Sequence, residues 1–286
     1  MQLVTVNPTQ AIAALRVCVA IDKPAFFYGK PGVGKTSTIR AFCRDNILGL
    51  IIVNLNTMEP VDMRGLPHDD GKATVWRRPS WLPQIERDGP KGIVFFDESN
   101  CNRAMFPTLF QVFLDRYCGE HEIPRGWLPI GAGNYRSDKA AAVEMPSAFN
   151  NRVANFDYVH DSAFWSGELA ARLGIHPIVA AYIRFRPDML HLMPGEKPQA
   201  THIPQIPADA RSFPTPRAYE SVSDVFKQNP DSSLRQTLIA AIVGPETAAD
   251  IESFYRVYSE AMPPADIKAN PDSAPLTSST GLDYSV

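Results

Sequence analysis

Residues 29–36, with the sequence GKPGVGKT, constrain the fold of this chain more than any other stretch. They fit the pattern G-x-x-x-x-G-K-[ST], in which the backbone of a glycine-rich loop binds phosphate groups. The apolar run 25–28 before the loop predicts a strand, and residues 37–44 after it favour a helix. A strand, a glycine loop and a helix in this order indicate a nucleotide-binding domain of the α/β class. The alternative is a glycine-rich turn that only opens a helix.

The residue types in this loop suit phosphate binding. Glycine tolerates backbone conformations in which successive N–H groups point at an anion, and the following helix adds its partial positive charge. The ammonium of Lys35 can reach the β- and γ-phosphates, and the hydroxyl of Thr36 can bind Mg²⁺. The residues expected to contact the nucleotide are Gly29, Pro31, Gly32, Val33, Gly34, Lys35, Thr36 and Ser37.

Two acidic residues end another apolar run, 92–98, with the sequence GIVFFDE. An unbroken apolar run is typical of a strand that a parallel sheet buries on both faces. Because ligands bind beyond the carboxyl ends of such strands, we expect Asp97 and Glu98 to lie beside the phosphate-binding loop. Asp97 is the expected carboxylate for Mg²⁺, directly or through water, and Glu98 the expected base for an attacking water. The alternative is a pair of solvated acids.

Further apolar runs predict strands at 51–55, 127–132 and 153–159. The run 127–132 leads to Asn134, which is placed to hydrogen-bond the γ-phosphate or the attacking water. Taken alone, an asparagine at this position can equally cap a turn. Residues 8–20 and 103–117 have the apolar spacing of helices.

The segment 56–92 differs from its surroundings because it is rich in proline and glycine. It predicts an inserted excursion with a short hairpin around residues 73–76, in place of a simple crossover helix. Trp76 and Trp81 lie in this segment. Packing of the two rings onto the body of the domain is favoured over a pore-facing or partner-facing role.

Strand signals stop after about residue 160, and the rest of the chain favours helices. We expect a nucleotide-binding domain at 1–160, a helical domain at 161–260, and a flexible or partner-wrapping tail at 261–286. The helices are expected at 162–173, 177–185, 216–226, 232–243 and 246–259, with a proline-rich loop over 194–214.

Composition narrows the functional classes. The net charge of −3 gives no overall basic footprint for nucleic acid, although a local basic patch remains compatible with it. The four cysteines lack C-x-x-C spacing, so we expect reduced thiols in a cytoplasmic protein and neither a disulfide framework nor a zinc site. No signal peptide is evident, and apolar runs such as 48–53 are too short to span a bilayer.

Together these motifs resemble those of the AAA+ ATPases and, within them, the MoxR-like branch. The resemblance covers about residues 1–260. The Walker motifs alone would indicate only a P-loop NTPase, and the later motifs, in the right order, narrow the resemblance to AAA+. The matching segments are 29–36 for Walker A, 59–65 for the helix 2 insertion, 93–98 for Walker B, 100–104 for the N-R-A signature, 131–134 for sensor 1, 146–152 for the arginine finger and 213–217 for sensor 2.

The resemblance implies a P-loop NTPase core with a five-stranded parallel sheet in the order 5-1-4-3-2, followed by a small C-terminal helical lid. It also implies a homo-oligomeric ring, usually a hexamer, that binds ATP and Mg²⁺ at subunit interfaces. The expectation of ATP over GTP rests on this resemblance and on no single residue.

Two arginines would complete the site in such a ring. Arg217 would approach the γ-phosphate from the lid of the same subunit, and Arg152 from the neighbouring subunit. The alternatives are pairing of Arg217 with Glu220 on one helix, and a structural role for Arg152 before a strand. Arg103 is a further candidate interface arginine with no assigned role.

Two positions depart from the family pattern. Tyr135 follows the sensor asparagine where proline is common, and Val153 follows Arg152 where phenylalanine is usual. Neither change removes a charge, so neither argues strongly against activity.

The favoured function is a Mg²⁺-dependent ring ATPase that remodels or activates a separate protein partner. The alternative is an AAA+ motor acting on nucleic acid, such as a loader or a replication or packaging factor. The acidic net charge argues mildly against it. A third reading is a nucleotide-gated structural subunit with little turnover, against which the complete set of Lys35, Asp97 and Glu98 argues.

Overall fold

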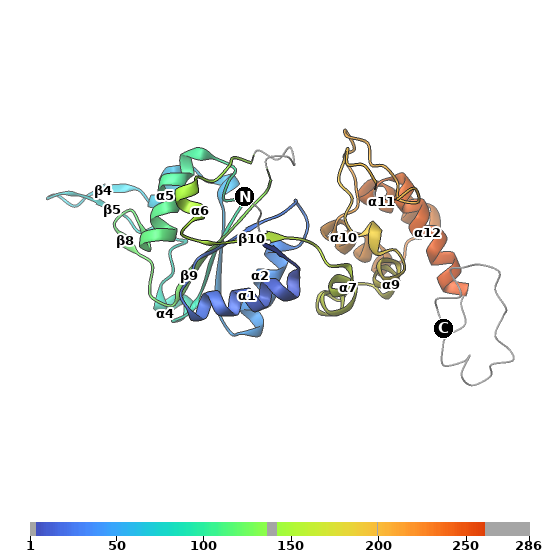
Figure 1. Cartoon of the computed structure of the whole chain (residues 1–286), viewed down its shortest axis with the longest axis horizontal. Helices are drawn as coiled ribbons and strands as arrows, with labels where there is room; N and C mark the ends of the chain where they lie inside the picture. Colours follow the sequence, from blue (N-terminus) through green and yellow to red (C-terminus); the bar gives the residue numbers. More distant parts are fainter. Residues whose placement is uncertain (1–3, 136–141, 199, 261–286) are drawn as a thin grey trace. The chain divides into compact units, whose positions relative to one another are not determined.

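The structure is a computed structural model that describes residues 4–135, 142–198 and 200–260. The chain divides into two compact units, Met1–Val159 and His160–Val286. Figure 1 shows an α/β layered arrangement in the first unit and helices in the second. The tail expected at 261–286 lies outside the described residues. Among the described residues, no helix is both long enough and apolar enough to cross a bilayer.

A parallel sheet forms the centre of the first unit, and the described residues contribute six strands to it. The expectation of five strands was one short. The strand it missed, β1, lies at the sheet edge beyond β10, where its three residues are too few to give a periodic pattern and Val4 is 65% exposed. In sheet order the strands are β1 (Val4–Val6), β10 (Ala154–Tyr158), β2 (Ala25–Tyr28), β9 (Trp127–Gly133), β6 (Gly92–Asp97) and β3 (Gly49–Asn54).

The unbroken apolar strands place hydrophobic side chains on both faces of this sheet. Successive side chains of a strand point to opposite faces, so Phe26 and Phe96 join one hydrophobic core while Phe27 and Phe95 join another. Helices α1 and α2 cover the second of these faces, and α5 and α6 cover the first (Figure 1). These helices are α1 (Pro8–Ala20), α2 (Lys35–Asp45), α5 (Phe106–Phe110) and α6 (Ser147–Asn150).

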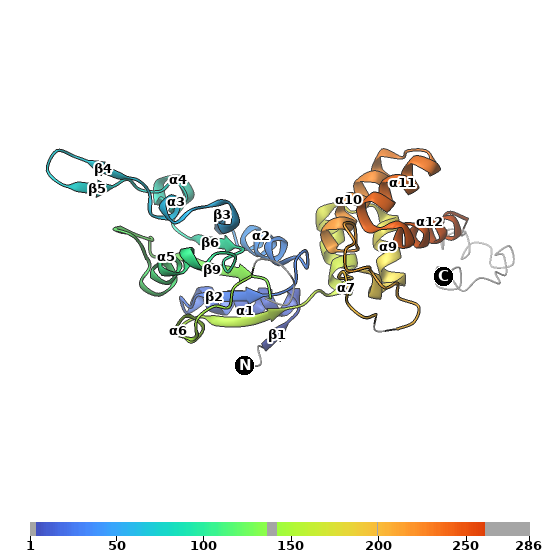
Figure 2. The same ribbon diagram turned by 90° about the horizontal axis from the view of Figure 1, so that it is seen from above.

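The insert between β3 and β6 contains the expected hairpin. Strand β4 (Pro67–Asp69) pairs antiparallel with β5 (Thr74–Trp76), and the hairpin extends away from the sheet in Figures 1 and 2. Trp81 packs against Phe96 with ring centroids 5.4 Å apart, and its indole N–H donates to the Met63 carbonyl at 3.2 Å. The ring of Trp81 therefore fixes the insert to the body of the unit. Around the hairpin lie η1 (Leu55–Thr57), α3 (Pro60–Arg64) and α4 (Ile85–Asp88).

The helix expected at 103–117 is shorter and less regular than its spacing indicated. It consists of η2 (Arg103–Met105), α5 and a π-helical turn, η3 (Gln111–Asp115). Arg116 then takes a left-handed conformation with φ of 62° and ends the helix. A small antiparallel hairpin follows, formed by β7 (Tyr117–Cys118) and β8 (His121–Glu122). Strands of two residues leave no pattern in the sequence, so this hairpin was not predicted.

The described residues of the second unit form helices around their own core, which includes Trp165, Tyr182 and Tyr219. Thr215 and Asp231 cap two of the helices, each accepting hydrogen bonds from backbone N–H groups of the first turn. The elements are α7 (Ser162–Phe164), η5 (Trp165–Leu169), α8 (Ala170–Leu173), α9 (Pro177–Phe185), η6 (Pro187–Met189), α10 (Pro216–Gln228), α11 (Ser232–Val243) and α12 (Pro245–Glu260).

A buried ion pair joins α11 to α12. Arg235 contacts Glu252 through two hydrogen bonds of 2.7 and 2.8 Å, and the two residues are only 7% and 3% exposed. The guanidinium also lies over the Tyr255 ring, 4.4 Å from its centroid. Removing one partner would leave a buried charge unpaired, so this contact controls how the last two helices pack.

We therefore expect Arg235→Ala to lower the free energy of unfolding by about 3–5 kcal/mol, the cost of a broken buried pair. The matched control is Lys227→Ala, which removes an exposed pair with Asp224 and should cost less than about 1 kcal/mol. Urea denaturation followed by circular dichroism measures both. Equal effects of the two substitutions would show that the Arg235 pair does not hold the helices together.

Candidate nucleotide-binding site

The phosphate-binding loop connects β2 to α2, as the motif predicted. Gly32 and Gly34 have φ angles of 75° and 100°, a region that side chains with a Cβ rarely adopt. Gly29 is constrained differently, because a Cβ there would lie 2.6 Å from the Tyr158 carbonyl oxygen on β10. A larger residue is therefore excluded at each of the three positions. Together the glycines allow the loop backbone to curve before the first turn of α2.

Lys35 is buried within the curve of this loop, with 9% exposure. Its ammonium donates hydrogen bonds to the Gly29 carbonyl at 2.5 Å, to the Lys30 carbonyl at 3.1 Å and to Asn134 Oδ1 at 3.1 Å. The charge is thus held between the loop and the end of β9. Phosphate oxygens would offer it stronger, charge-assisted hydrogen bonds than these neutral acceptors do.

Thr36 and Asp97 meet across the same edge of the sheet. The Thr36 hydroxyl donates to Asp97 Oδ2 at 2.7 Å, although the two residues are 61 positions apart. A hydroxyl and a carboxylate are oxygen ligands that suit Mg²⁺, which usually takes one or two carboxylates together with water and substrate phosphates. The pair therefore fits the predicted metal site, with Thr36 and Asp97 as its protein ligands.

Glu98 occupies a sharp turn directly after β6. Its φ of 52° is uncommon for a residue other than glycine, and such backbone conformations concentrate at functional sites. Its N–H donates to Asp97 Oδ1 at 3.0 Å, which fixes the turn. Glu98 is half-buried. Burial raises the pKa of the Cys101 thiol, and the nearby charge of Glu98 raises it further. The two acids thus leave the strand on a locally constrained backbone.

Asn134 follows the end of β9 and contacts Lys35, so three strand ends converge at this edge. The structure adds a residue that was not among the predicted site residues. Asn100 is 3% exposed and hydrogen-bonds to both the N–H and the carbonyl of Asn134. In the sequence, Asn100 is only the first residue of the segment 100–104 that resembles the N-R-A signature. Its role depends on tertiary contacts, and no spacing rule within one sequence would have identified it.

Tyr135, which stands where the proteins that the motifs resemble commonly have proline, bridges two strands. Its hydroxyl donates to the Asp157 carboxylate, and its ring stacks with Tyr28 at a centroid distance of 6.4 Å. The Tyr28 hydroxyl in turn donates to Asn150 Oδ1 at 3.0 Å. The tyrosine therefore links the end of β9 to β10 beside the loop.

The two arginines predicted to reach the γ-phosphate lie in different units, and both are exposed. Arg152 precedes β10, and its side chain makes no hydrogen bond or ion pair with the residues that the structure describes. Arg217 is the second residue of α10 in the helical unit. Burial raises the pKa of Glu220, and the charge of Arg217 opposes that rise.

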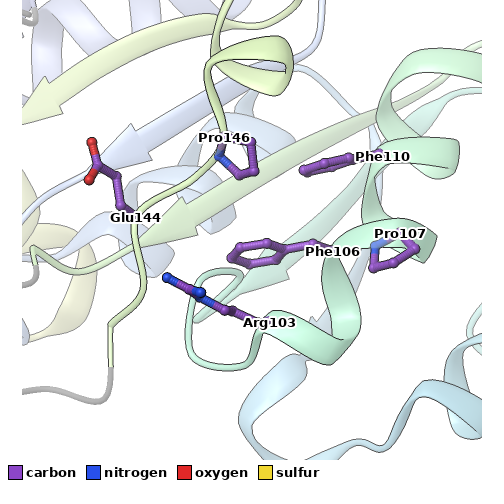
Figure 3. Close-up of a pocket in the computed structure, with 6 residues that line it drawn as sticks. All are labelled: Arg103, Phe106, Pro107, Phe110, Glu144 and Pro146. Atoms are coloured by element: carbon purple, nitrogen blue, oxygen red, sulfur yellow. The ribbon is translucent and has the colours of Figure 1, made fainter.

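Arg103, the third arginine considered, lines a pocket of about 570 Å³ (Figure 3). In Figure 3, Arg103 lies on one side of the pocket and Glu144 on the other. The rings of Phe106 and Phe110 line it and stack with centroids 5.9 Å apart. The pocket thus lies between η2 and α5 on one side and the segment that leads into α6 on the other.

Comparisons with known proteins give distant likenesses of fold. No protein-family model matches the chain, and no curated protein sequence matches it. A putative ATPase from Cytophaga hutchinsonii has a TM-score of 0.42 and 13% identity, covering 81% of this chain and 62% of its own. This chain therefore spans less than two thirds of that protein's length.

Two other solved structures have similar values. The Thermotoga maritima RuvB Holliday junction branch migration motor has a TM-score of 0.45 and 15% identity, over 91% of this chain and 72% of its own. NtrX from Brucella abortus, in complex with ADP, has a TM-score of 0.39 and 14% identity, over 86% and 67%.

The metal site makes a direct prediction. Asp97→Asn keeps the volume of the side chain but removes its charge. The ratio of ATP affinity in Mg²⁺ to ATP affinity in EDTA should therefore be at least about 10-fold smaller than in the unaltered protein. The matched control is Asp157→Asn, a carboxylate at the end of β10 that contacts Tyr135. Titration with a fluorescent ATP analogue, in Mg²⁺ and then in EDTA, measures the effect. Unchanged Mg²⁺ dependence in Asp97→Asn would remove Asp97 from the metal site.

Proposed function

We propose that this protein is a Mg²⁺-dependent ATP hydrolase of the AAA+ type, with its site at the carboxyl edge of the central sheet. The observation that carries the proposal is the meeting of three separate strand ends. The ammonium of Lys35 contacts Asn134, and the hydroxyl of Thr36 contacts Asp97. These contacts, between residues up to 99 positions apart, support the roles of the glycine loop in phosphate binding, of Asp97 in metal binding and of Asn134 as a sensor.

The chemistry of these groups suits transfer of a phosphoryl group to water. Such reactions depend on positioning and on positive charge around the transferred group. Lys35 would place its charge beside the β- and γ-phosphates, and Asn134 would orient the γ-phosphate or the attacking water. Glu98 would accept the proton of that water. Bound Mg²⁺ would neutralise charge developing on the phosphates, held by Thr36 and Asp97.

The position of Arg152 supports action on a neighbouring subunit. Strand β10 runs parallel to β2 with Ala154 opposite Ala25, so Arg152 lies at the amino edge of the sheet. The phosphate-binding loop lies at the carboxyl edge, roughly 15–20 Å further along at about 3.3 Å per residue. An arginine side chain is too short to cover that distance, so Arg152 would serve the site of another copy.

We propose that copies of the chain form a homo-oligomeric ring, with six subunits as the AAA+ resemblance implies, because the position of Arg152 calls for a neighbouring copy. Arg217 would complete each site from the helical unit of the same subunit and would respond to the presence of the γ-phosphate. Within the MoxR-like branch that the motifs resemble, such a ring uses ATP turnover to remodel or activate a separate protein. We propose that this chain likewise remodels or activates a separate protein in the cytoplasm.

The role of Glu98 is tested by Glu98→Gln. The amide keeps the shape of the side chain but accepts no proton, so hydrolysis should fall by about 10²–10⁴-fold while ATP stays bound. Glu86→Gln, at an exposed position of α4, is the matched control and should hydrolyse ATP normally. Phosphate release and filter binding give the two readouts. Normal turnover by Glu98→Gln would exclude this residue as the base.

The role of Arg152 is tested by mixing two inactive variants. Arg152→Ala should lose about 10³-fold or more in turnover, as expected for removal of an arginine that stabilises the transition state. Mixed with Glu98→Gln, it should regain activity, because its intact site would then lie beside a neighbour with an intact Arg152. Arg44→Ala, an exposed arginine on α2, controls for loss of charge. Absence of any regain in mixtures would contradict action between subunits.

A further inference from the structure

The side-chain amide of Asn100 hydrogen-bonds to the backbone of Asn134 and of Val143 through both its oxygen and its nitrogen. Its Oδ1 accepts from the Asn134 N–H at 3.2 Å, and its Nδ2 donates to the Asn134 carbonyl at 2.9 Å. Nδ2 also donates to the Val143 carbonyl at 3.0 Å, while the Asn100 carbonyl accepts from the Val143 N–H at 2.7 Å. One buried residue therefore holds the chain at both Asn134 and Val143.

Gly133, the residue before Asn134, leaves room for the Asn100 side chain because it has no Cβ. A Cβ on Gly133 would lie 2.4 Å from Asn100 Oδ1 and 3.1 Å from the Phe26 ring, so no side chain fits there. The amide of Asn100 is thus packed directly against the end of β9. Its position two residues after Glu98 also ties the turn that carries the acids to the strand that carries Asn134.

We propose that Asn100 is a positioning residue for hydrolysis, which holds Asn134 Oδ1 in register with Lys35 and the γ-phosphate. The inference rests on the proposed ATPase function. Asn134 is only half-buried and its side chain contacts Lys35 at 3.1 Å, so its direction depends on how its backbone is held. Two of the hydrogen bonds that hold this backbone come from Asn100. The Val143 contacts fix the amide of Asn100 from the other side.

The energetic argument follows from burial. In a site of low dielectric constant, a fully satisfied amide strongly favours one arrangement, and loss of its donors removes a hydrogen bond from each of two partly buried carbonyls. A displacement of about 1 Å in a positioning group can lower a rate about 100-fold. Nucleotide affinity depends on the loop and on Lys35, so it should change far less than the rate.

Two substitutions test the proposal by independent routes. Asn100→Asp keeps the volume but replaces both donors with a charged acceptor, and Gly133→Ala displaces Asn100 without altering it or adding charge. Each should lower kcat about 100-fold, and in Gly133→Ala the Kd for ATP should change less than about 3-fold. Asn46→Ala removes a similar side-chain-to-carbonyl hydrogen bond at an exposed helix end and should leave both unchanged.

A double-mutant cycle separates positioning from general damage. If Asn100 acts through Asn134, then Asn100→Asp combined with Asn134→Ala should turn over no more slowly than Asn134→Ala alone. Two results would overturn the positioning role and leave the ATPase assignment intact. One is a double variant whose rate falls by the product of the two single effects. The other is normal turnover by Asn100→Asp when Asn134→Ala is slow.

Amide hydrogen exchange decides the proposal even where no turnover is measured. The Asn134 N–H should exchange faster in Gly133→Ala, which displaces its acceptor Asn100 Oδ1, than in Asn46→Ala. Unchanged exchange would overturn the clamp. A protein that neither binds nor hydrolyses ATP, with exchange altered as expected, would instead refute the proposed function and leave Asn100 as the residue that fixes Asn134.

Discussion

The hydrogen bonds of a single strand, β9, assemble the candidate site. On one side β9 pairs with β2, with Gly133 opposite Tyr28, and the pairing continues as Gly29 N–H donates to the Gly133 carbonyl at 3.2 Å. On the other side β9 pairs with β6, and Ser99 N–H donates to the Ala132 carbonyl at 2.8 Å just beyond the acidic pair. A shift of one residue in either register would turn its side chains to the opposite face. The loop, the two acids and Asn134 would then separate.

Much of this arrangement was predictable from local pattern. Runs buried on both faces predicted the strands, and the glycine loop predicted its own neighbours, because these features depend on a few consecutive residues. What could not be predicted depends on contacts between distant residues. Trp127 is one case: a Cβ on Gly49 or on Gly92 would lie 2.5 Å from its ring, so a residue of a third strand helps to explain two strand glycines. Asn100 and the edge strand β1 are others.

The electrostatics of the loop connect its resting geometry to its proposed task. Lys35 brings a full charge into a buried position, where three neutral oxygen acceptors satisfy it. A charge held in this way is already desolvated, so an arriving anion need not remove water from it. The same acceptors link the ammonium to Asn134 and, through it, to the Asn100 clamp. Phosphate binding at the loop would therefore act directly on Asn134, the residue proposed to orient the γ-phosphate or the attacking water.

The most direct test of the account is calorimetric titration of the protein with ATP in the presence of Mg²⁺. The account predicts one ATP per chain and loss of that binding in Lys35→Ala. Lys91→Ala, an exposed lysine before β6 at the opposite edge of the same sheet, should bind as the unaltered protein does. Absence of binding by the unaltered protein, or equal binding by Lys35→Ala while its fold is intact, would contradict the central claim that this edge of the sheet is a nucleotide site.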